Sequence, residues 1–354
     1  MNKDIDYNQI VADAAAELRK HSDWRAAFSR YADMIIATSD VYKDASKALK
    51  QQLPKEMGLL RIYTSIALVQ KSQKNAYFDL RIYGQSVGGL VFKYGKLYLS
   101  ITAKQQQNNQ AHLHIETIAN PLRKPYPMES NDAQKIIKEF TEYDGVGAEM
   151  KSREHQYETL ILHDLVQTTS TRKKITYCRP VMLGEYGFFQ MRTVFAASRH
   201  QPKYAMNGRA AMGGGIDILA RIQHKDGTWR LAVMELKDEN KGSESQPVVM
   251  MQAMIYATFI GYLLRDADCG KKWWNLFRNQ DDVKSIQPII DIDVITVMPT
   301  DKTGKLPVAK MEKDIPIPGI NNVSLHPYSL YVDVDLEKSI IKKISGSLCN
   351  EKKS

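Results

Sequence analysis

The chain of 354 residues contains only three cysteines, Cys178, Cys269 and Cys349, and they are widely spaced. An odd, scattered set forms neither a disulfide framework nor a CxxC zinc motif, and it suits a reducing compartment. No apolar run reaches the roughly 18 residues of a membrane span, and the first residues lack the basic, then apolar pattern of a secretory signal. We therefore expect a cytoplasmic protein with no membrane segment.

Glycine motifs that bind nucleotide phosphates are also missing. There is no GxxxxGK[ST] sequence, and Gly213-Gly214-Gly215 does not match GxGxxG. Such motifs arrange backbone amides around phosphate groups. We therefore expect no nucleotide-driven translocation within this chain.

Acidic residues are outnumbered, since 49 Lys and Arg face 40 Asp and Glu and give a formal net charge of +9. A positive charge suits a polyanionic partner, because Lys and Arg beside phosphates release bound counterions. Many soluble proteins carry such a charge for solubility alone, so charge by itself leaves nucleic-acid binding open.

The first third of the chain has its own pattern. Apolar residues recur at helical spacing over 6–50, and strand-like runs separated by glycine turns follow at 76–83, 87–92 and 96–101, which predicts helices and an antiparallel meander. The polar stretch 105–110 is typical of an exposed loop. Three prolines then place a boundary near 120–132. The predicted units are 1–128, an N-terminal α+β domain of unknown role; 129–335, a second domain; and 336–354, a basic C-terminal helix or tail.

The second domain alternates helices and strands. An amphipathic stripe over 154–166 predicts a helix that covers a sheet. A second helix opens at Gln246-Pro247, with proline in its first turn, and is apolar nearly all round. The run 290–298 is a strand that a right-handed crossover should place beside the strand of Glu235. This order predicts a mixed sheet with helices on both faces.

The most informative segment is a β-hairpin whose arms are 215–221 and 231–237. Gly227 in the turn can adopt positive φ. If the loop is 225–227, the numbers of facing residues sum to 452, and Asp217 lies opposite Glu235. A loop of Asp226-Gly227 alone would instead place Leu236 opposite Asp217 and break the site.

Facing carboxylates on antiparallel strands are roughly 4.5–5.5 Å apart at Cβ. They repel unless a proton or cation lies between them. Mg²⁺, or Mn²⁺, is the simplest cation that fits, because it binds hard oxygen ligands and keeps waters. Lys237 shares the face of Glu235 because side chains alternate along a strand. The competing interpretation is a solvated salt-bridge cluster.

At Asp217 and Glu235-Leu236-Lys237 the chain resembles the PD-(D/E)xK nuclease superfamily, which has the restriction-endonuclease-like fold. Gly213-Gly214-Gly215 stands where that family often has proline before the aspartate. The following helix carries Gln252 and Tyr256, similar to the Gln-x-x-x-Tyr element of RecB-type nucleases. The resemblance covers roughly residues 150–300 and says nothing firm about residues 1–130. It implies an α/β fold, a restriction-endonuclease-like mixed sheet flanked by helices, beside the N-terminal α+β domain.

The resemblance also implies roles. Asp217 and Glu235 would hold the metal, with the backbone carbonyl of Leu236 as a third ligand, while Lys237 would orient or deprotonate water or neutralise a phosphate oxygen. Gln252 and Tyr256 would contact this group, although core roles are equally consistent with their positions. An acidic residue from the preceding helix often joins such sites; Glu154 and Glu158 both qualify, and we select Glu158 because it adjoins the apolar stripe.

A segment of cations and aromatics follows the buried helix. Lys271, Lys272 and Arg278 flank Trp273 and Trp274, a mixture that could grip a nucleic-acid backbone. An amphipathic helix that buries its tryptophans is the favoured interpretation.

The leading hypothesis is a Mg²⁺- or Mn²⁺-dependent nuclease that hydrolyses phosphodiester bonds, most simply in DNA. The N-terminal domain would serve targeting, homo-oligomerisation or binding of a protein partner. The alternatives are a catalytically inactive nuclease-fold protein acting as a nucleic-acid-binding or assembly module, and a metal-dependent hydrolase with a non-nucleic substrate.

Overall fold

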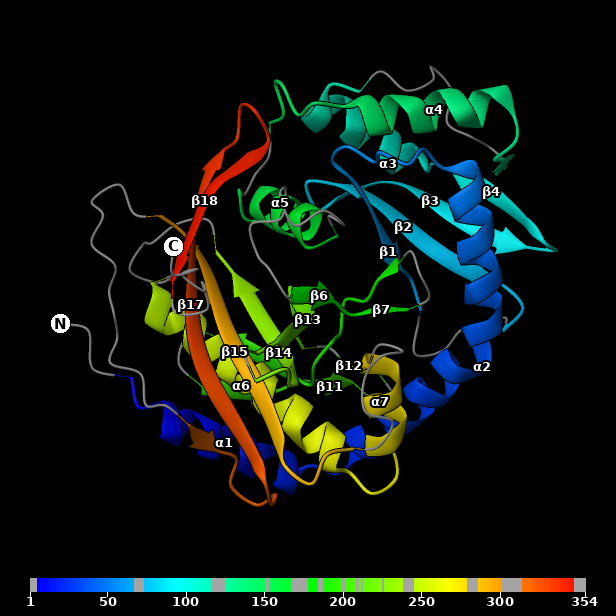
Figure 1. Ribbon diagram of the computed structural model, residues 1–354. Helices are drawn as coiled ribbons and strands as arrows, with labels where there is room; N and C mark the ends of the chain where they lie inside the picture. The colour runs from blue at the N-terminus through cyan, green and yellow to red at the C-terminus, as the bar shows by residue number, and fades with distance from the viewer. Residues whose placement is uncertain are drawn as a thin grey trace.

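The computed structural model of the protein is shown in Figure 1. It describes residues 5–66, 73–115, 125–149, 153–166, 178–183, 187–198, 201–207, 210–211, 213–224, 226–237, 245–278, 286–300 and 314–346.

Two helices open the chain, α1 (Tyr7–Lys20) and α2 (Asp23–Gln52). Asp6 caps the first, because its Oδ1 accepts a hydrogen bond from the Gln9 amide at 3.1 Å. The helical region expected over 6–50 is therefore two helices that meet at 21–22.

The N-terminal sheet has the predicted meander at its centre. Its order is β5-β4-β3-β2-β1-β8-β7. The bounds are β1 (Leu60–Thr64), β2 (Ala76–Ile82), β3 (Gln85–Lys93), β4 (Lys96–Ser100), β5 (Tyr126–Pro127), β7 (Met182–Leu183) and β8 (Gly187–Phe188). Strands β1 to β5 are antiparallel, whereas β8 joins β1 in parallel through Tyr63 and Phe188. A segment from beyond residue 180 thus extends a sheet built by the first third.

One face of this sheet is a hydrophobic core. Buried residues alternate along β2, and the core face packs on the C-terminal half of α2 and on α4 (Asn131–Glu142). The polar stretch 105–110 is not a loop: it belongs to α3 (Ala103–Asn108) and a π-helical turn, η1 (Asn109–Leu113). A capping box between Thr102 and Gln105 starts α3, a local signal that composition alone had hidden.

The second sheet is mixed, as the sequence predicts. Its order is β16-β17-β15-β14-β13-β6, with β18 paired to β17. The bounds are β6 (Cys178–Pro180), β13 (Ile218–Gln223), β14 (Trp229–Leu236), β15 (Ile290–Pro299), β16 (Ile315–Pro316), β17 (Val323–Asp335) and β18 (Ile340–Gly346). Strands β14, β15 and β17 are parallel, and the other pairs are antiparallel. The expectation that the strand after the buried helix lies beside the Glu235 strand is confirmed.

Helices cover both faces of the second sheet (Figure 1). On one face lies α6 (Gln246–Arg265), which is buried along most of its length, with α1 and the first half of α2 beyond it. On the other lies α5 (Glu154–Val166), between this sheet and the N-terminal sheet. By length and composition α6 could cross a membrane, but it is the core helix of this fold.

The predicted hairpin has the register that the site requires. Ile218 pairs with Met234 and Gln223 with Trp229, so facing numbers sum to 452. His224 donates its amide to Thr228 at 2.8 Å, and Gly227 has φ +83°. The loop is therefore 225–227, and the longer of the two weighed loops is confirmed.

The remaining described strands form two short hairpins. They are β9 (Phe195–Ser198) with β10 (Gln201–Tyr204), and β11 (Met206–Asn207) with β12 (Ala210–Ala211).

The C-terminal expectation needs revision, and the hydrophobic clusters bear on the N-terminal boundary. The helix or tail expected over 336–354 begins instead with the strand β18, because Ile341 and Ile344 pair with β17 at the sheet edge; residues 347–354 lie outside the described part. The hydrophobic clusters also cross the boundary expected at 128, since α1 and the first half of α2 share a core with α6. The N-terminal helices therefore stabilise the sheet that carries the hairpin.

Candidate active site

Asp217 and Glu235 meet at the open end of the β13–β14 hairpin. Asp217 directly precedes β13, and its Oδ2 accepts a hydrogen bond from the Leu236 amide at 2.8 Å. Glu235 is buried on β14, and its Oε1 accepts from Gln252 Nε2 at 2.7 Å. The other oxygen, Glu235 Oε2, is buried and accepts no hydrogen bond from the described residues. A buried carboxylate oxygen without a donor is a position that a proton or a cation would satisfy.

Burial and neighbouring negative charges disfavour the charged forms of both acids. Burial, then the charge of Glu158, raises the pKa of Asp217 to about 7, against the opposing effects of Lys237 and the Leu236 amide. Burial, then the charge of Asp217, raises the pKa of Glu235 well above its usual range. Two acids that resist ionisation together bind a dication readily, because the cation removes both penalties.

Lys237 lies where the alternation of β14 predicts. Its Nζ is 4.0 Å from Glu235 Oε1 and 3.0 Å from Glu154 Oε2. Burial alone would lower the pKa of Lys237, but Glu235, Asp217 and Glu154 outweigh burial and raise it. Lys237 is therefore a cation at neutral pH, held against the acid pair.

Gln252 and Tyr256 both approach the acid pair from α6. Gln252 Nε2 bridges Glu235 Oε1 and the Tyr256 hydroxyl, which lies 3.4 Å away. A methyl group added at Gly214 would meet the Tyr256 oxygen at 1.9 Å. The Gly213-Gly214-Gly215 run therefore lets the backbone pass directly beside this tyrosine.

Glu158 has partners that sequence reasoning did not identify. Its Oε1 accepts a hydrogen bond from Tyr63 of β1 at 2.6 Å, and its Oε2 lies 3.2 Å from His155 Nδ1. The hydrogen bond with Glu158 raises the pKa of His155. Glu158 acts on Asp217 through its charge, whereas Glu154, the alternative on the same helix, holds Lys237.

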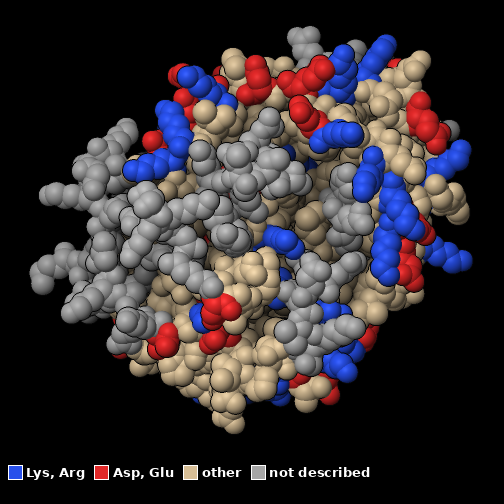
Figure 2. All heavy atoms as spheres, in the orientation of Figure 1, with Lys and Arg blue, Asp and Glu red and all other residues tan. Residues whose placement is uncertain are grey.

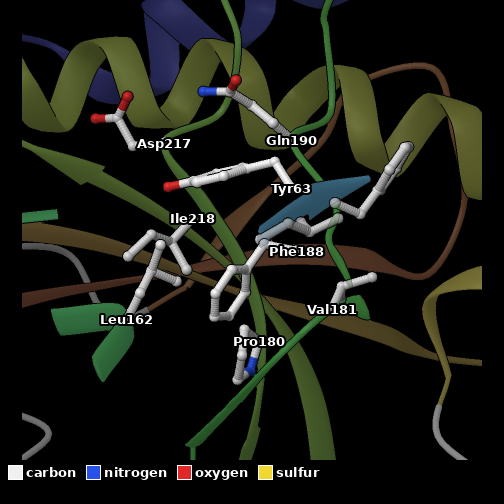
Figure 3. Close-up of a pocket in the computed structure, with 10 residues that line it drawn as sticks. Tyr63, Leu162, Pro180, Val181, Phe188, Gln190, Asp217 and Ile218 are labelled. Atoms are coloured by element: carbon white, nitrogen blue, oxygen red, sulfur yellow. The ribbon is translucent and has the colours of Figure 1, made fainter. Parts of the chain in front are cut away.

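A small, partly open pocket adjoins Asp217. Figure 3 shows Asp217, Gln190 and the Tyr63 hydroxyl toward one end, with Leu162 and Phe188 toward the other. Arg81 stacks 4.3 Å above the Tyr63 ring and donates to Gln190 Oε1 at 3.2 Å. The N-terminal sheet therefore supplies part of the wall.

The donor set fits a divalent cation with few protein ligands. Asp217 and Glu235 supply two carboxylates, and Glu235 Oε2 receives no donor from the described residues while its acid form can hydrogen-bond to Asp217. In the part of the chain that the structure describes, no group of three or more His, Cys, Asp and Glu has a metal-binding arrangement. Magnesium commonly uses one or two carboxylates and takes its other ligands from water and substrate phosphates. Leu236 adjoins the pair through its amide, and its predicted role as a carbonyl ligand stays a prediction.

The basic segment after α6 is the helix α7 (Gly270–Phe277), with Trp273 and Trp274 buried. This confirms the amphipathic interpretation. Lys272 pairs with Asp33 at 2.7 Å, Lys271 is exposed, and Arg278 donates to Asn275. Over the face shown in Figure 2, Lys and Arg mix with Asp and Glu and are densest over α2. Nucleic-acid binding by Lys271, Lys272 and Arg278 stays a prediction.

Several residues beside the predicted site gave no sequence signal. Tyr63 and Arg81 lie far from the hairpin in sequence, and no motif links them to it. Gln190 lies in an irregular segment after β8. Glu154 is different, because the sequence named it as the alternative to Glu158, one turn away on the same predicted helix. Comparisons with protein-family models, with curated proteins and with solved structures find no match for this chain.

Proposed function

We propose that the protein is a metal-dependent nuclease that hydrolyses phosphodiester bonds in DNA, on a restriction-endonuclease-like core. The single observation that carries the proposal is the Asp217–Glu235 pair, with Glu235 buried and Asp217 half-buried, beside the cation of Lys237. The order of elements also supports the proposal. The chain runs through β13, β14, α6 and β15, as the PD-(D/E)xK resemblance predicts, and Asp217 and Glu235 lie at β13 and β14.

Each residue has a role that its contacts support. Asp217 and Glu235 would hold Mg²⁺ or Mn²⁺, which supplies positive charge for the phosphate oxygens and activates water. Gln252 fixes Glu235 through Oε1 and leaves Oε2 for the ion. Lys237 stays protonated and would neutralise a non-bridging oxygen rather than remove a proton. Glu154 anchors Lys237, and Glu158 supports the high proton affinity of Asp217.

A second candidate is a nuclease-fold module that binds nucleic acid without cutting it. This candidate is favoured because polar side chains at the site already bind one another: Lys237 is paired with Glu154, and Gln252 with Glu235. The lack of a three-ligand cluster among described residues points the same way. In such a module, Asp217 and Glu235 would share a proton and would not bind a metal ion.

Cleavage of labelled DNA with Mg²⁺ or Mn²⁺ separates the two candidates. Wild type is compared with Asp217→Asn and with Asp226→Asn, a matched change in the exposed turn of the same hairpin. The nuclease proposal expects Asp217→Asn to lose at least about a hundredfold in rate and Asp226→Asn to keep it. Equal rates in all three proteins would reveal a contaminant, and no cleavage of single- or double-stranded DNA would leave the binding module.

A further inference from the structure

The N-terminal sheet has a second face, opposite the core that α2 and α4 cover. Along β2, β3 and β4 every second residue is half-buried: Tyr77, Asp79, Arg81, Gly89, Val91, Lys93, Tyr98 and Ser100. We name these eight residues the open face. Helix α5 packs beside this face at β1, where Arg61 donates to the Thr159 carbonyl and Tyr63 to Glu158, and at the β2–β3 turn, where His155 lies against Gly84. From β2 outward the side chains stay partly accessible.

Strand pairing arranges the open face in rows. Tyr77 pairs with Val91, and Val91 pairs with Tyr98, so two rings flank a small apolar residue. The next row has Asp79, Gly89 and Ser100, where the glycine leaves a shallow place between strands. Rings spaced across a sheet can stack on bases, because every base presents an apolar face.

The tip of the β3–β4 hairpin continues this surface with charge and another ring. Lys93 and Lys96 pair directly across the tip, and neither has a carboxylate partner among the described residues. Like charges in that position destabilise a hairpin unless an anion offsets them. Lys93 Nζ also lies 4.9 Å from the Tyr98 ring.

Tyr94 at the tip is 90% exposed and has φ +52°, followed by Gly95 at +75°. A two-residue turn of this kind prefers Asn-Gly, and a bulky residue there is strained. The chain thus presents an aromatic ring to solvent, between two lysines, at a local energetic cost. Strain of this kind is typical of positions kept for binding.

The open face leads to the candidate active site. Arg81 belongs to the face, stacks on Tyr63 and donates to Gln190, and all three adjoin or line the pocket beside Asp217. In Figure 1 α4 lies on one side of this sheet and the second sheet on the other. A nucleic-acid strand that crossed the face from the tip would therefore reach the pocket beside Asp217.

We infer that the open face and the Lys93–Lys96 tip bind single-stranded DNA and deliver it to the site of Asp217 and Glu235. The charge of the tip suits a phosphate backbone, and the tyrosines suit unpaired bases, whereas Arg81 is ion-paired with Asp79 of the same face and contributes through its position beside the pocket. The choice of DNA rests on the proposed function. The choice of a single strand follows from the exposed tyrosine rings, because the bases of a duplex are already stacked and cannot stack on them.

Fluorescence anisotropy of a labelled single-stranded oligonucleotide tests this, with chelator present so that no cleavage occurs. Tyr94→Asn should weaken binding roughly five- to a hundredfold, although asparagine suits the turn and should keep or raise stability. Tyr94→Phe keeps the ring and should bind as wild type. The Lys93→Ala, Lys96→Ala double variant should lower the slope of log K against log salt by about 1.4.

The matched control for charge is Lys20→Ala with Lys138→Ala, two exposed lysines on α1 and α4. It should leave the salt slope unchanged. The inference would be overturned if Tyr94→Asn bound with wild-type affinity or if the two double variants had equal salt slopes. It would also be overturned if single-stranded DNA did not bind, or if a duplex or RNA of the same sequence bound more tightly. If DNA binds through this face but is not cleaved, the binding inference stands and the nuclease proposal fails. If cleavage depends on Asp217 but the face has no role in binding, the nuclease proposal stands and the binding inference fails.

Discussion

The hydroxyl of Tyr63 lies 2.6 Å from Oε1 of Glu158. Tyr63 belongs to β1 of the N-terminal sheet, and Glu158 to the helix that separates the two sheets. Burial, followed by the charge and the hydrogen bond of Glu158, raises the pKa of this tyrosine well above its usual range, so it donates at every physiological pH. The negative charge of Glu158 also raises the pKa of Asp217. Strand β1, which holds Glu158 through Tyr63, therefore helps to set the proton affinity of Asp217, the candidate metal ligand.

Removal of that hydroxyl should therefore destabilise the protein. In Tyr63→Phe, Glu158 loses a buried donor, and the free energy of unfolding should fall by about 1–3 kcal/mol. Denaturant unfolding monitored by tryptophan fluorescence measures the change. Tyr94→Phe, at a 90% exposed position, is the matched control and should change little. A Tyr63→Phe protein as stable as the control would show that the bond contributes no net stability.

The metal-free protein should lose stability as pH rises. Asp217 has its pKa raised from near 4 to about 7 in the folded state, so between these values the folded protein holds the proton more tightly than the unfolded chain. Stability from this group is complete below about pH 4 and is lost by about pH 7. Between pH 5 and pH 8 the loss should be about 2–3 kcal/mol more in wild type than in Asp217→Asn, which cannot ionise.

A divalent cation should reverse that loss. At pH 8, Mg²⁺ or Mn²⁺ should stabilise wild type in proportion to the logarithm of its concentration, because it binds the folded state alone. Asp217→Asn should show no such gain, and Asp226→Asn should behave as wild type. Identical responses of all three proteins to the metal would place the ion elsewhere and remove Asp217 from its coordination.

The hairpin could be predicted because its determinants are local. Turn length and a glycine at positive φ set the register, and the register sets which side chains face one another. The same holds for α5, whose observed bounds Glu154–Val166 match the predicted range, since the apolar stripe decides them. The fold around the acid pair followed from patterns of this kind.

The surroundings of the pair could not be predicted, because they depend on contacts between distant segments. The choice of Glu158 over Glu154 depended on the helix face alone, whereas the structure gives the two acids different partners, Tyr63 and Lys237. The expected loop at 105–110 failed because a capping box outweighed polar composition. The C-terminal strand β18 exists only because β17 offers it an edge.

The glycine run before Asp217 should be sensitive at one position and tolerant at the next. A methyl group at Gly214 would meet the Tyr256 oxygen at 1.9 Å, whereas at Gly215 it would meet only the Gln190 side chain, at 3.5 Å. Neither glycine has positive φ, so the comparison isolates space. Gly214→Ala should cost about 1–3 kcal/mol of stability and displace Tyr256 from Gln252, while Gly215→Ala should cost little.

Thermal or denaturant unfolding of the two alanine variants checks this, together with their cleavage rates. A Gly214→Ala protein that is as stable and as active as Gly215→Ala would mean that Tyr256 moves aside freely. The hydrogen bond from Gln252 to Tyr256 would then be incidental to the arrangement of Glu235.

The last prediction separates two roles of Lys237. Its pKa is raised because Glu235, Asp217 and Glu154 together outweigh burial, so the amine is charged at neutral pH. If Lys237 acts as a cation that neutralises phosphate, the cleavage rate should not depend on its titration over pH 6 to pH 9, where the amine stays charged. If it acts as a base, the rate should rise steeply with pH as the free amine becomes more populated. Lys237→Met should lose about a hundredfold or more in rate at all pH values.

Glu154→Gln sharpens the comparison, because it removes one of the carboxylates that raise the pKa of Lys237 and releases its 3.0 Å anchor. If Lys237 is a base, the lower pKa should increase the rate at neutral pH. If it is a cation, the looser anchor should decrease the rate, by about tenfold or less. Glu142→Gln, an exposed change on α4, is the control. Measurement of cleavage rates from pH 6 to pH 9 for the three variants decides between the roles, since the two outcomes for Glu154→Gln have opposite signs.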